Sequence, residues 1–471
     1  MKKKIGIFWI REDFRILKNN ALAAATKNHD QVVAIYIFKK NLFKNREAQG
    51  WWICKSLENY KSDLKKFNIN LQILPANDYT SVFNSLFKKN NFSIYWNKIY
   101  EPDYLKFDEK VSKMLISKKI NFKIFKGNIL NEFDEVKKLD NTPFKVFTPY
   151  WRSAERVFFE KVPPSNPNIK KCKKIVYLNC EDTTIQKIFA KKKWHSKFEE
   201  NWMPSEQNAL QKLKDFFKQK ANNYGAGRDV PFNNGTSKLS PYIKNGQLHV
   251  ETIFAESKKY NIDKYNLKKF LTEIGWREFN HSLINFFPYM LKENYSKKFD
   301  KFPWQKDKAL LNSWKTGNTG YPIVDAGMKE LYETGWMHNR VRMIVGSFLV
   351  KHLLINWKEG ESYFRNCLLD FSEANNVAGW QWVAGSGADA APYFRIFNPI
   401  LQGEKFDKNG DYVKKWIPKL ARIPKKFIHK PWEMDKELQK SCDIEIGKDY
   451  PLPIVDHAKA REQALAAFKK I

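Results

Sequence analysis

Five short apolar runs, separated by segments of helix length, constrain the start of this 471-residue chain. The runs are rich in Ile, Val and Phe, as expected of strands that are buried on both faces. Parallel strands need long crossovers, and the spacing leaves room for helices. We therefore predict an α/β domain over residues 1–130 with a parallel, Rossmann-like sheet of strands Ile5–Ile10, Val32–Phe38, Leu71–Leu74, Phe92–Trp96 and Phe122–Phe125. No GxGxxG follows the first run, which argues against a dinucleotide bound there in the Rossmann manner.

Residues 131–200 have a different character. They contain a cluster of breaker residues, Pro163–Asn168, and lysine runs at Lys170–Lys174 and Lys191–Lys193. Such a segment is typical of a long connection across a surface, with its charges in solvent. We expect an interdomain linker here.

Beyond residue 201 the apolar spacing becomes helical. Leu349, Leu353 and Leu354 share one face of a helical segment that we expect to run from about Asp325 to Asn356. Ala458–Phe468 has the composition of another helix. The sequence therefore predicts an all-α domain over residues 201–471.

Net charge and composition only weakly restrict the function. The chain has 83 Lys and Arg against 51 Asp and Glu, a formal charge of +32, which suggests a polyanionic partner such as nucleic acid. The excess is mostly lysine, and coding bias in an AT-rich gene is an equally good explanation. With 43% hydrophobic and 15% aromatic residues, a disordered chain is excluded.

The five cysteines indicate neither a disulfide framework nor a metal centre. They form no CxxC pair and have no histidine at zinc spacing. The apolar run near the N-terminus is too short for a signal peptide, and no stretch is long enough to span a membrane. We expect a cytoplasmic protein that binds no metal and no membrane.

Three segments carry candidate functional residues. In Gly235–Tyr242, Thr236 and Ser237 precede Ser240-Pro241, which we expect to be a helix N-cap and first helical residue. Such donors suit a phosphate or pyrophosphate, but an ordinary capped helix explains them as well.

The second segment is Trp336–Met343, which we place within the helical segment above. Asn339, Arg342 and Met343 can share one face there, an unusual mixture for a core stripe and therefore a candidate site. His338 lies off that face, so we interpret it as a structural histidine.

The third segment runs from Asp370 to Trp382 and on through Gly385 to Pro399. Its dense glycine and alanine let backbone approach something large and flat, and its tryptophans offer stacking surface. Most tryptophans in any chain are core residues, which is the competing interpretation.

With Phe8–Arg15, Trp276–Phe279 and Gly320–Met328, these segments resemble the cryptochrome/photolyase family, and within it the DNA photolyases that repair cyclobutane pyrimidine dimers. The resemblance covers nearly the whole chain and is densest from Gly335 to Lys415. It implies an α/β antenna domain, a linker, and a helical catalytic domain that binds FAD and DNA.

The resemblance also implies roles for individual residues. Asn376 matches the residue that faces flavin N5, where a neutral amide favours the reduced anionic flavin because it does not repel the charge. Arg342 and Asp370 match an ion pair beside the flavin ring. The pyrophosphate and ribityl chain of FAD are expected at Tyr224, Thr236, Ser237, Leu239 and Ser240.

A flipped-out dimer is expected to lie against the flavin, held by Glu273, Trp276, Asn339, Met343 and Trp382. Glu273 can hydrogen-bond a pyrimidine carbonyl, and the tryptophans offer apolar walls. In related enzymes that repair (6-4) photoproducts, positions 339 and 343 are expected to be histidines. Asn339 and Met343 therefore favour the cyclobutane dimer as substrate.

Further matched positions imply electron transfer and DNA binding. Trp380, Trp357 and Trp304 match a chain that carries electrons from the surface to the flavin. Arg228, Arg395 and Lys405 are expected to contact DNA phosphates. Ser372 stands where the family usually has an aspartate, so the flavin contacts can differ there. The antenna chromophore is expected to be methenyltetrahydrofolate, with a deazaflavin as the alternative, and Glu101 is a candidate contact.

Together these matches imply a monomeric enzyme, a deoxyribodipyrimidine photo-lyase, that splits dimers in damaged DNA by electron transfer from photoexcited reduced FAD. The alternative is a cryptochrome-type blue-light photoreceptor without repair activity. A basic nucleic-acid-binding protein without catalysis is a third possibility, against which the FAD-cradle segment argues.

Overall fold

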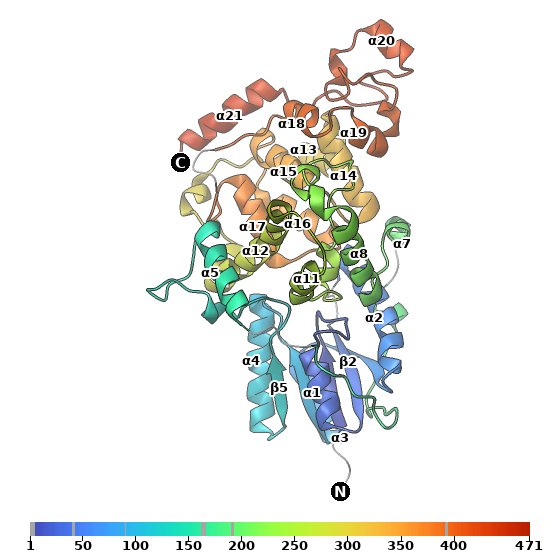
Figure 1. The fold of residues 1–471 in the computed structure, drawn as a ribbon. Coiled ribbons are helices and arrows are strands. Elements are labelled where there is room, and N and C mark those ends of the chain that lie inside the picture. The colour runs from blue at the N-terminus through green and yellow to red at the C-terminus, as the bar shows by residue number, and fades with distance from the viewer. Residues whose placement is uncertain (1–4, 40–42, 90, 162–165, 190–192, 391–393) are drawn as a thin grey trace.

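The computed structural model describes residues 5–39, 43–89, 91–161, 166–189, 193–390 and 394–471. Parts of the breaker cluster (162–165) and of the second lysine run (190–192) lie outside the described residues, as do 391–393 of the third candidate segment. Figure 1 shows a sheet-containing part at the bottom, near the N-terminus, and a larger helical part above it that contains the C-terminus.

The first part is built on a five-stranded sheet in the order β3-β2-β1-β4-β5. Every neighbouring pair is parallel, for example Phe8 opposite Ala34 and Tyr95. The strands are β1 Ile5–Ile10, β2 Val32–Lys39, β3 Asn70–Ala76, β4 Phe92–Asn97 and β5 Phe122–Phe125. The predicted parallel sheet is confirmed, with β2 and β3 longer than their apolar runs.

Helices cover both faces of this sheet (Figure 1). Alternate strand residues point to opposite faces, so Phe8 and Ile10 of β1 pack under α1 and α2, whereas Ile7 and Trp9 pack under α3 and α4. These helices are α1 Asn20–Asn28, α2 Glu47–Lys65, α3 Tyr79–Lys89 and α4 Pro102–Ser117. Burial on two faces explains why the strands are apolar throughout.

Residues 131–200 pack against both the helical part and the sheet-containing part. The amphipathic helix α5 (Phe147–Glu160) buries Phe147, Tyr150 and Trp151 in the core of the helical part. Farther on, Cys172 and Leu178 are buried against the two faces of the sheet. The short elements here are η1 Phe133–Glu135, α6 Ile185–Ile188, η2 Lys193–His195 and α7 Phe198–Asn201.

The rest of the described chain is helical and has one large apolar core, which confirms the predicted fold class. The predicted C-terminal helix is present as α21. The elements are α8 Glu206–Gln219, η3 Ala221–Asn223, α9 Tyr224–Gly227, α10 Ser240–Lys244, α11 Val250–Ser257, α12 Lys264–Phe286, η4 Pro288–Leu291, η5 Lys297–Lys301, α13 Lys308–Thr316, α14 Pro322–Thr334, α15 Asn339–Ser347, η6 Phe348–His352, α16 Trp357–Cys367, α17 Glu373–Ala384, α18 Pro399–Phe406, α19 Asp411–Trp416, η7 Pro418–Leu420, η8 Pro431–Glu433, α20 Lys436–Ser441 and α21 His457–Lys469.

The single helical segment expected from Asp325 to Asn356 is wrong, because the chain breaks after Thr334. Gly335 ends α14 in the left-handed conformation, with φ of 67°. A Cβ there would lie 2.6 Å from the Leu369 side chain, so the position needs glycine. A new helix, α15, starts after His338, whose ring accepts a hydrogen bond from the Arg340 amide. The structural role expected for His338 is thus a helix cap.

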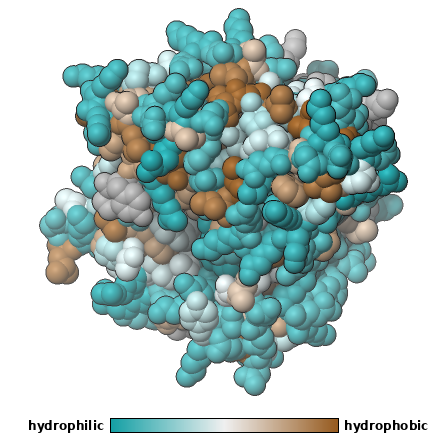
Figure 2. Space-filling model, turned by 90° about the horizontal axis from the view of Figure 1, so that it is seen from above, coloured by the Kyte–Doolittle hydropathy of each residue, from teal (hydrophilic) through white to brown (hydrophobic). Residues whose placement is uncertain are grey.

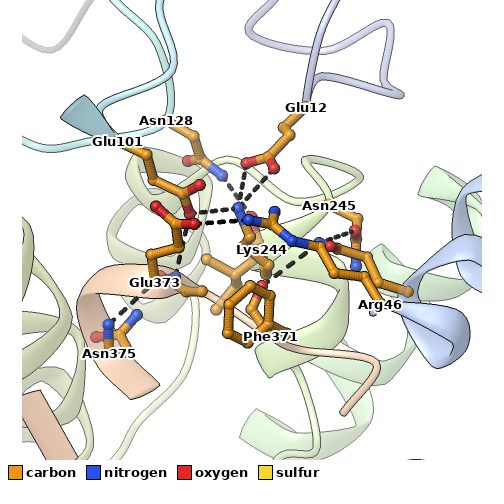
Figure 3. A network of polar contacts seen from close by, with 12 residues as sticks. Glu12, Arg46, Glu101, Asn128, Lys244, Asn245, Phe371, Glu373 and Asn375 are labelled. Carbon is orange, nitrogen blue, oxygen red and sulfur yellow. Dashed lines mark hydrogen bonds and ion pairs between the residues drawn. The ribbon is translucent and has the colours of Figure 1, made fainter. Parts of the chain in front are cut away.

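A buried ionic network joins the two parts (Figure 3). Lys244, at the end of α10, lies between two carboxylates of the sheet domain, 2.6 Å from Glu12 and 2.9 Å from Glu101. Arg46 of the same domain pairs with Glu373 of α17 at 2.6 Å. Glu101 also accepts a hydrogen bond from the Glu373 amide, so a residue of the sheet domain caps a helix of the other domain. The network therefore fixes how α10 and α17 meet the sheet domain.

The burial of Glu101 bears on its expected antenna role. Its side chain is only 1% exposed, and one carboxylate oxygen is committed to Lys244 and the α17 amide. Burial alone raises the pKa of this carboxyl group, but Lys244 and Arg46 more than offset the effect and lower it to about 2. The other carboxylate oxygen, Oε2, is buried without a partner among the described residues, and an antenna role for Glu101 stays a prediction.

We predict that Glu101→Gln lowers the free energy of unfolding at pH 7 by about 3 kcal/mol, because Lys244 loses a counter-charge in a buried site. The pKa of Glu101 is lowered on folding from 4.5 to about 2. Its contribution is therefore fully present above pH 4.5 and is lost as the pH falls towards 2. Urea unfolding at pH 7 and pH 3 should show the difference between wild type and variant shrinking at the lower pH.

The matched control is Glu109→Gln, since Glu109 pairs with Lys113 on the exposed surface of α4. It should leave the free energy of unfolding close to that of the wild type at both pH values, because solvent screens an exposed ion pair. An equal effect of Glu101→Gln at both pH values would contradict the assigned ionic role.

Candidate active site

A cavity of about 580 Å³ lies within the helical part, bounded mainly by α10, α12, α15 and α17. Fourteen of the residues singled out from the sequence line it, and these come from segments far apart in the chain. They are Tyr224, Arg228, Ser237, Leu239, Ser240, Glu273, Trp276, Asn339, Arg342, Met343, Asp370, Asn376, Trp380 and Trp382. Thr236, Trp304, Trp357, Arg395, Lys405 and Glu101 are not among the lining residues.

Three of the lining residues form a polar cluster. Arg342 donates to Asp370 Oδ2 at 2.8 Å, and Ser240 Oγ donates to the same oxygen at 2.6 Å. The predicted ion pair is therefore present. Asp370 Oδ1 is buried without a partner among the described residues, so it can accept a hydrogen bond from a ligand.

Ser240 differs from its predicted role as an N-cap. Leu239 occupies the cap position of α10 and Ser240 is the first helical residue, followed by Pro241. The Ser240 hydroxyl is bound to Asp370 instead of a backbone amide. This hydroxyl therefore links the 236–240 segment to the loop before α17.

Asn376 lies on α17 with its amide group fixed. Its Nδ2 donates to the side chain of Glu361 at 3.0 Å and to the Glu361 carbonyl at 3.2 Å. Arg365 in turn holds the Glu361 carboxylate at 2.9 Å. The NH₂ group is thus used by the protein, which leaves Oδ1 as the atom that can accept a hydrogen bond from a ligand.

The backbone of α17 is open to the cavity at Gly379. An ideal Cβ on Gly379 meets no atom within 4 Å, although α17 otherwise packs in the core. A flat ring could approach the helix backbone here, as the glycine content suggested. About two turns earlier, the Ser372 hydroxyl caps α17 by accepting from the Asn375 amide at 3.5 Å, which gives the unusual serine a structural role.

The cavity lining also includes a carboxylate and several aromatic rings. Glu273 of α12 accepts a hydrogen bond from Arg228 at 2.5 Å, and about a third of its side chain is exposed. Arg228, predicted as a phosphate contact, is thus paired with Glu273. Nearby, Arg340 pairs with Asp229 at 2.9 Å.

Trp276 is held by a residue that the sequence analysis missed. Its ring stacks on Phe147 of α5 with centroids 3.7 Å apart and planes 8° apart. Phe147 therefore covers one face of Trp276, which also lines the cavity. The residues Phe147, Tyr150, Trp151 and Ala154 show the spacing of a buried helix face, a signal that was available in the sequence.

The three tryptophans of the expected electron chain differ in depth. Trp380 lines the cavity, Trp357 is 1% exposed, and Trp304 is half-buried. Trp357 donates its indole N–H to Asn294 at 2.8 Å. Gly360 gives Trp380 its space, since a Cβ there would lie 2.1 Å from the ring.

Arg395 and Lys405, the other predicted phosphate contacts, are exposed and form no ion pair within the described part of the chain. Figure 2 looks down on the helical part and shows hydrophilic residues over most of this face. A phosphate-binding role for both residues stays a prediction.

Comparison with known proteins shows the family. A family model described as DNA photolyase matches residues 6–168, and one described as FAD binding domain of DNA photolyase matches residues 270–470. A deoxyribodipyrimidine photo-lyase of Agrobacterium fabrum is 41% identical, over 99% of this chain and 98% of that protein. The chain belongs to the DNA photolyase family.

Two further relatives show the breadth of this family. A bacterial class III photolyase structure from Agrobacterium tumefaciens superposes with a TM-score of 0.94 at 39% identity, covering 100% of this chain and 98% of that one. Cryptochrome-2 of Arabidopsis thaliana is 33% identical, over 100% of this chain and 79% of its own length. The expected family, enzyme class and FAD-binding domain are confirmed.

Among the described residues, no helix is long and apolar enough to cross a membrane, and no group of three or more His, Cys, Asp or Glu could hold a metal ion.

We predict that Phe147→Ala weakens binding of the substrate at the Trp276 wall at least fivefold and leaves the cofactor unaffected, because Phe147 touches Trp276 from outside the cavity. Titration with dimer-containing oligothymidine measures substrate binding. Flavin absorbance of the purified variant measures how much cofactor it holds. Phe159→Ala, an exposed phenylalanine on the same helix, is the control. Loss of flavin from Phe147→Ala would show that α5 supports the whole cavity.

Gly379→Val should abolish FAD binding in a folded chain, because its side chain fills the open space beside α17. Far-UV circular dichroism and flavin content measure the two effects. Ala466→Val on the exposed face of α21 controls for a β-branched residue in a helix. Full flavin content in Gly379→Val would place the ring elsewhere.

Proposed function

We propose that this protein repairs cyclobutane pyrimidine dimers in DNA in a light-dependent reaction. The observation that carries the proposal is one cavity whose lining combines the Asp370–Arg342–Ser240 cluster with Glu273 and Trp276. The first group fits a flavin and the second fits a flipped-out pyrimidine dimer.

The residues present fit FAD. Tyr224, Ser237 and Leu239 offer the surface for its pyrophosphate and ribityl chain. The unpartnered Oδ1 of Asp370 and the free Oδ1 of Asn376 can accept hydrogen bonds from ring N–H groups, and Gly379 admits the ring. When bound and reduced, FAD supplies the light-absorbing group and the electron that splits the cyclobutane ring, and it recovers that electron afterwards.

Glu273 and the aromatic walls act on the dimer. Trp276 and Trp382 replace the stacking that a base loses when it leaves the helix. Glu273 accepts a hydrogen bond from a pyrimidine N–H, and Arg228 at 2.5 Å fixes its orientation. Both effects place the dimer without any acid–base step.

Asn339 and Met343 favour the cyclobutane dimer over a (6-4) photoproduct. Asn339 and Met343 line the cavity, and no histidine is found among its described lining residues. His338, next in sequence, is a buried cap, and burial lowers its pKa to about 4, so it is neutral near pH 7. The site therefore holds no imidazole to protonate a lesion.

The remaining roles stay part of this proposal. Trp380, Trp357 and Trp304 reduce the cofactor by relaying electrons from the surface, and Arg395 and Lys405 bind phosphates flanking the lesion. A folate antenna, a monomeric state and a cytoplasmic location are also predictions.

The decisive experiment uses dimer-containing oligothymidine. The purified, flavin-loaded protein is illuminated with blue light, and absorbance in the thymine band is followed. We expect recovery in the light and none in the dark. Flavin present without recovery would leave the cryptochrome-type photoreceptor as the better function, and a (6-4) substrate repaired in its place would overturn the dimer specificity.

Within that assay, Glu273→Ala should lower the repair yield at least tenfold and leave the flavin spectrum intact. Glu437→Ala, on the surface of α20, is the control and should have wild-type yield. Loss of flavin in Glu273→Ala would show that this carboxylate belongs to the cofactor site.

A further inference from the structure

A second cavity of about 310 Å³ lies on the outer side of the 236–239 segment, between α8, α14 and α19. Four lysines line it, together with three tryptophans: Lys212, Lys220, Lys238, Lys415, Trp202, Trp336 and Trp416. Its volume is at the lower end of that of small-molecule sites. Ser237 and Trp336 line both cavities, so the two are neighbours but separate.

The charge in this second cavity is not balanced. None of the four lysines forms an ion pair with a carboxylate of the described residues, in contrast to Lys244, which has two. The cavity wall includes two acidic residues. Asp215 accepts a hydrogen bond from Gln211, and Glu330 is buried and accepts from the His338 amide and the Tyr412 hydroxyl. Four cations thus face two carboxylates that are engaged elsewhere.

The tryptophans hold three of the four lysines in place without cancelling their charge. The ammonium of Lys238 lies 5.2 Å from the Trp336 ring centroid, that of Lys415 4.9 Å from Trp416, and that of Lys212 5.8 Å from Trp202. Cation–π contacts of this kind fix a cation on an aromatic face and leave its N–H donors available. The ammonium groups of these lysines therefore have defined positions in the cavity.

The lysines repel one another. Burial lowers the pKa of Lys238; Glu330 opposes the shift, and Lys415, Lys212 and Lys220 add to it. Burial and Lys212 likewise lower the pKa of Lys220. An anion with several negative charges would relieve this repulsion and would be held by all four groups.

We propose that this lysine pocket is a binding site for a small ligand that carries two linked phosphate groups. Lysine ammonium groups bind phosphate as point charges from several directions, which suits a compact, multiply charged anion. The proposal does not depend on DNA repair, because none of the four lysines lines the first cavity.

The test is calorimetric titration of the flavin-loaded protein with inorganic pyrophosphate in 150 mM NaCl. We expect one saturable site per chain, with orthophosphate bound at least tenfold more weakly. Titration with ADP distinguishes the source of the diphosphate: tighter binding than pyrophosphate indicates a nucleotide and equal binding an inorganic anion, and both support the site.

The matched variants lie on α8 and at its C-cap, Lys220. Lys212→Gln with Lys220→Gln should weaken pyrophosphate binding at least tenfold, whereas Lys214→Gln with Lys218→Gln, on the exposed face of α8, should change it less than twofold. Absence of a saturable site, equal losses in both double variants, or release of flavin in step with binding would overturn the proposal. If the wild-type protein binds pyrophosphate but repairs no dimers, the result contradicts the proposed repair function and leaves the lysine pocket supported.

Discussion

The buried ammonium of Lys244 is the constraint on which the arrangement of the two domains depends. A lysine that is 8% exposed must keep its counter-charges, and both of these come from the sheet domain. Close by, the left-handed Gly246 brings its Cα against the Glu12 carbonyl so tightly that a Cβ would lie 1.9 Å from that oxygen. The ion pairs of Lys244 have a fixed geometry, and the Gly246–Glu12 contact leaves no room for a side chain. Together they fix one relative orientation of the two domains. Since Lys244 also lines the first cavity, that docking shapes the site.

Ion pairs fix the direction of four charged side chains that line the first cavity. Arg342 pairs with Asp370, and Arg228 pairs with Glu273. The net charge of +32 is therefore not concentrated at this site. Part of the excess is found in the four unpaired lysines behind the 236–239 segment.

The sequence predicted those features that have a local pattern. The strands were visible because burial on both faces makes them continuously apolar, and Asn339, Arg342 and Met343 were placed together by helical spacing. The break at Gly335 was missed although glycine after Thr334 is a usual helix end, because the apolar spacing continues on both sides of it. Phe147 and Glu361 act through residues distant in the chain, so no local pattern assigns them their partners. The matched family motifs, not composition, pointed to the cavity residues.

The capping of α17 by Glu101 has a consequence for how such proteins can be recombined. The two domains look like modules joined by a connection, yet the start of the helix that carries Asn376 and Trp380 is completed by a side chain of the other module. An exchange of the sheet domain for that of a relative would have to bring Glu12, Arg46 and Glu101 as a set that matches Lys244 and Glu373. The sheet domain and α17 therefore have to be inherited together, and a chimaera folds correctly only if it keeps these five charged residues matched.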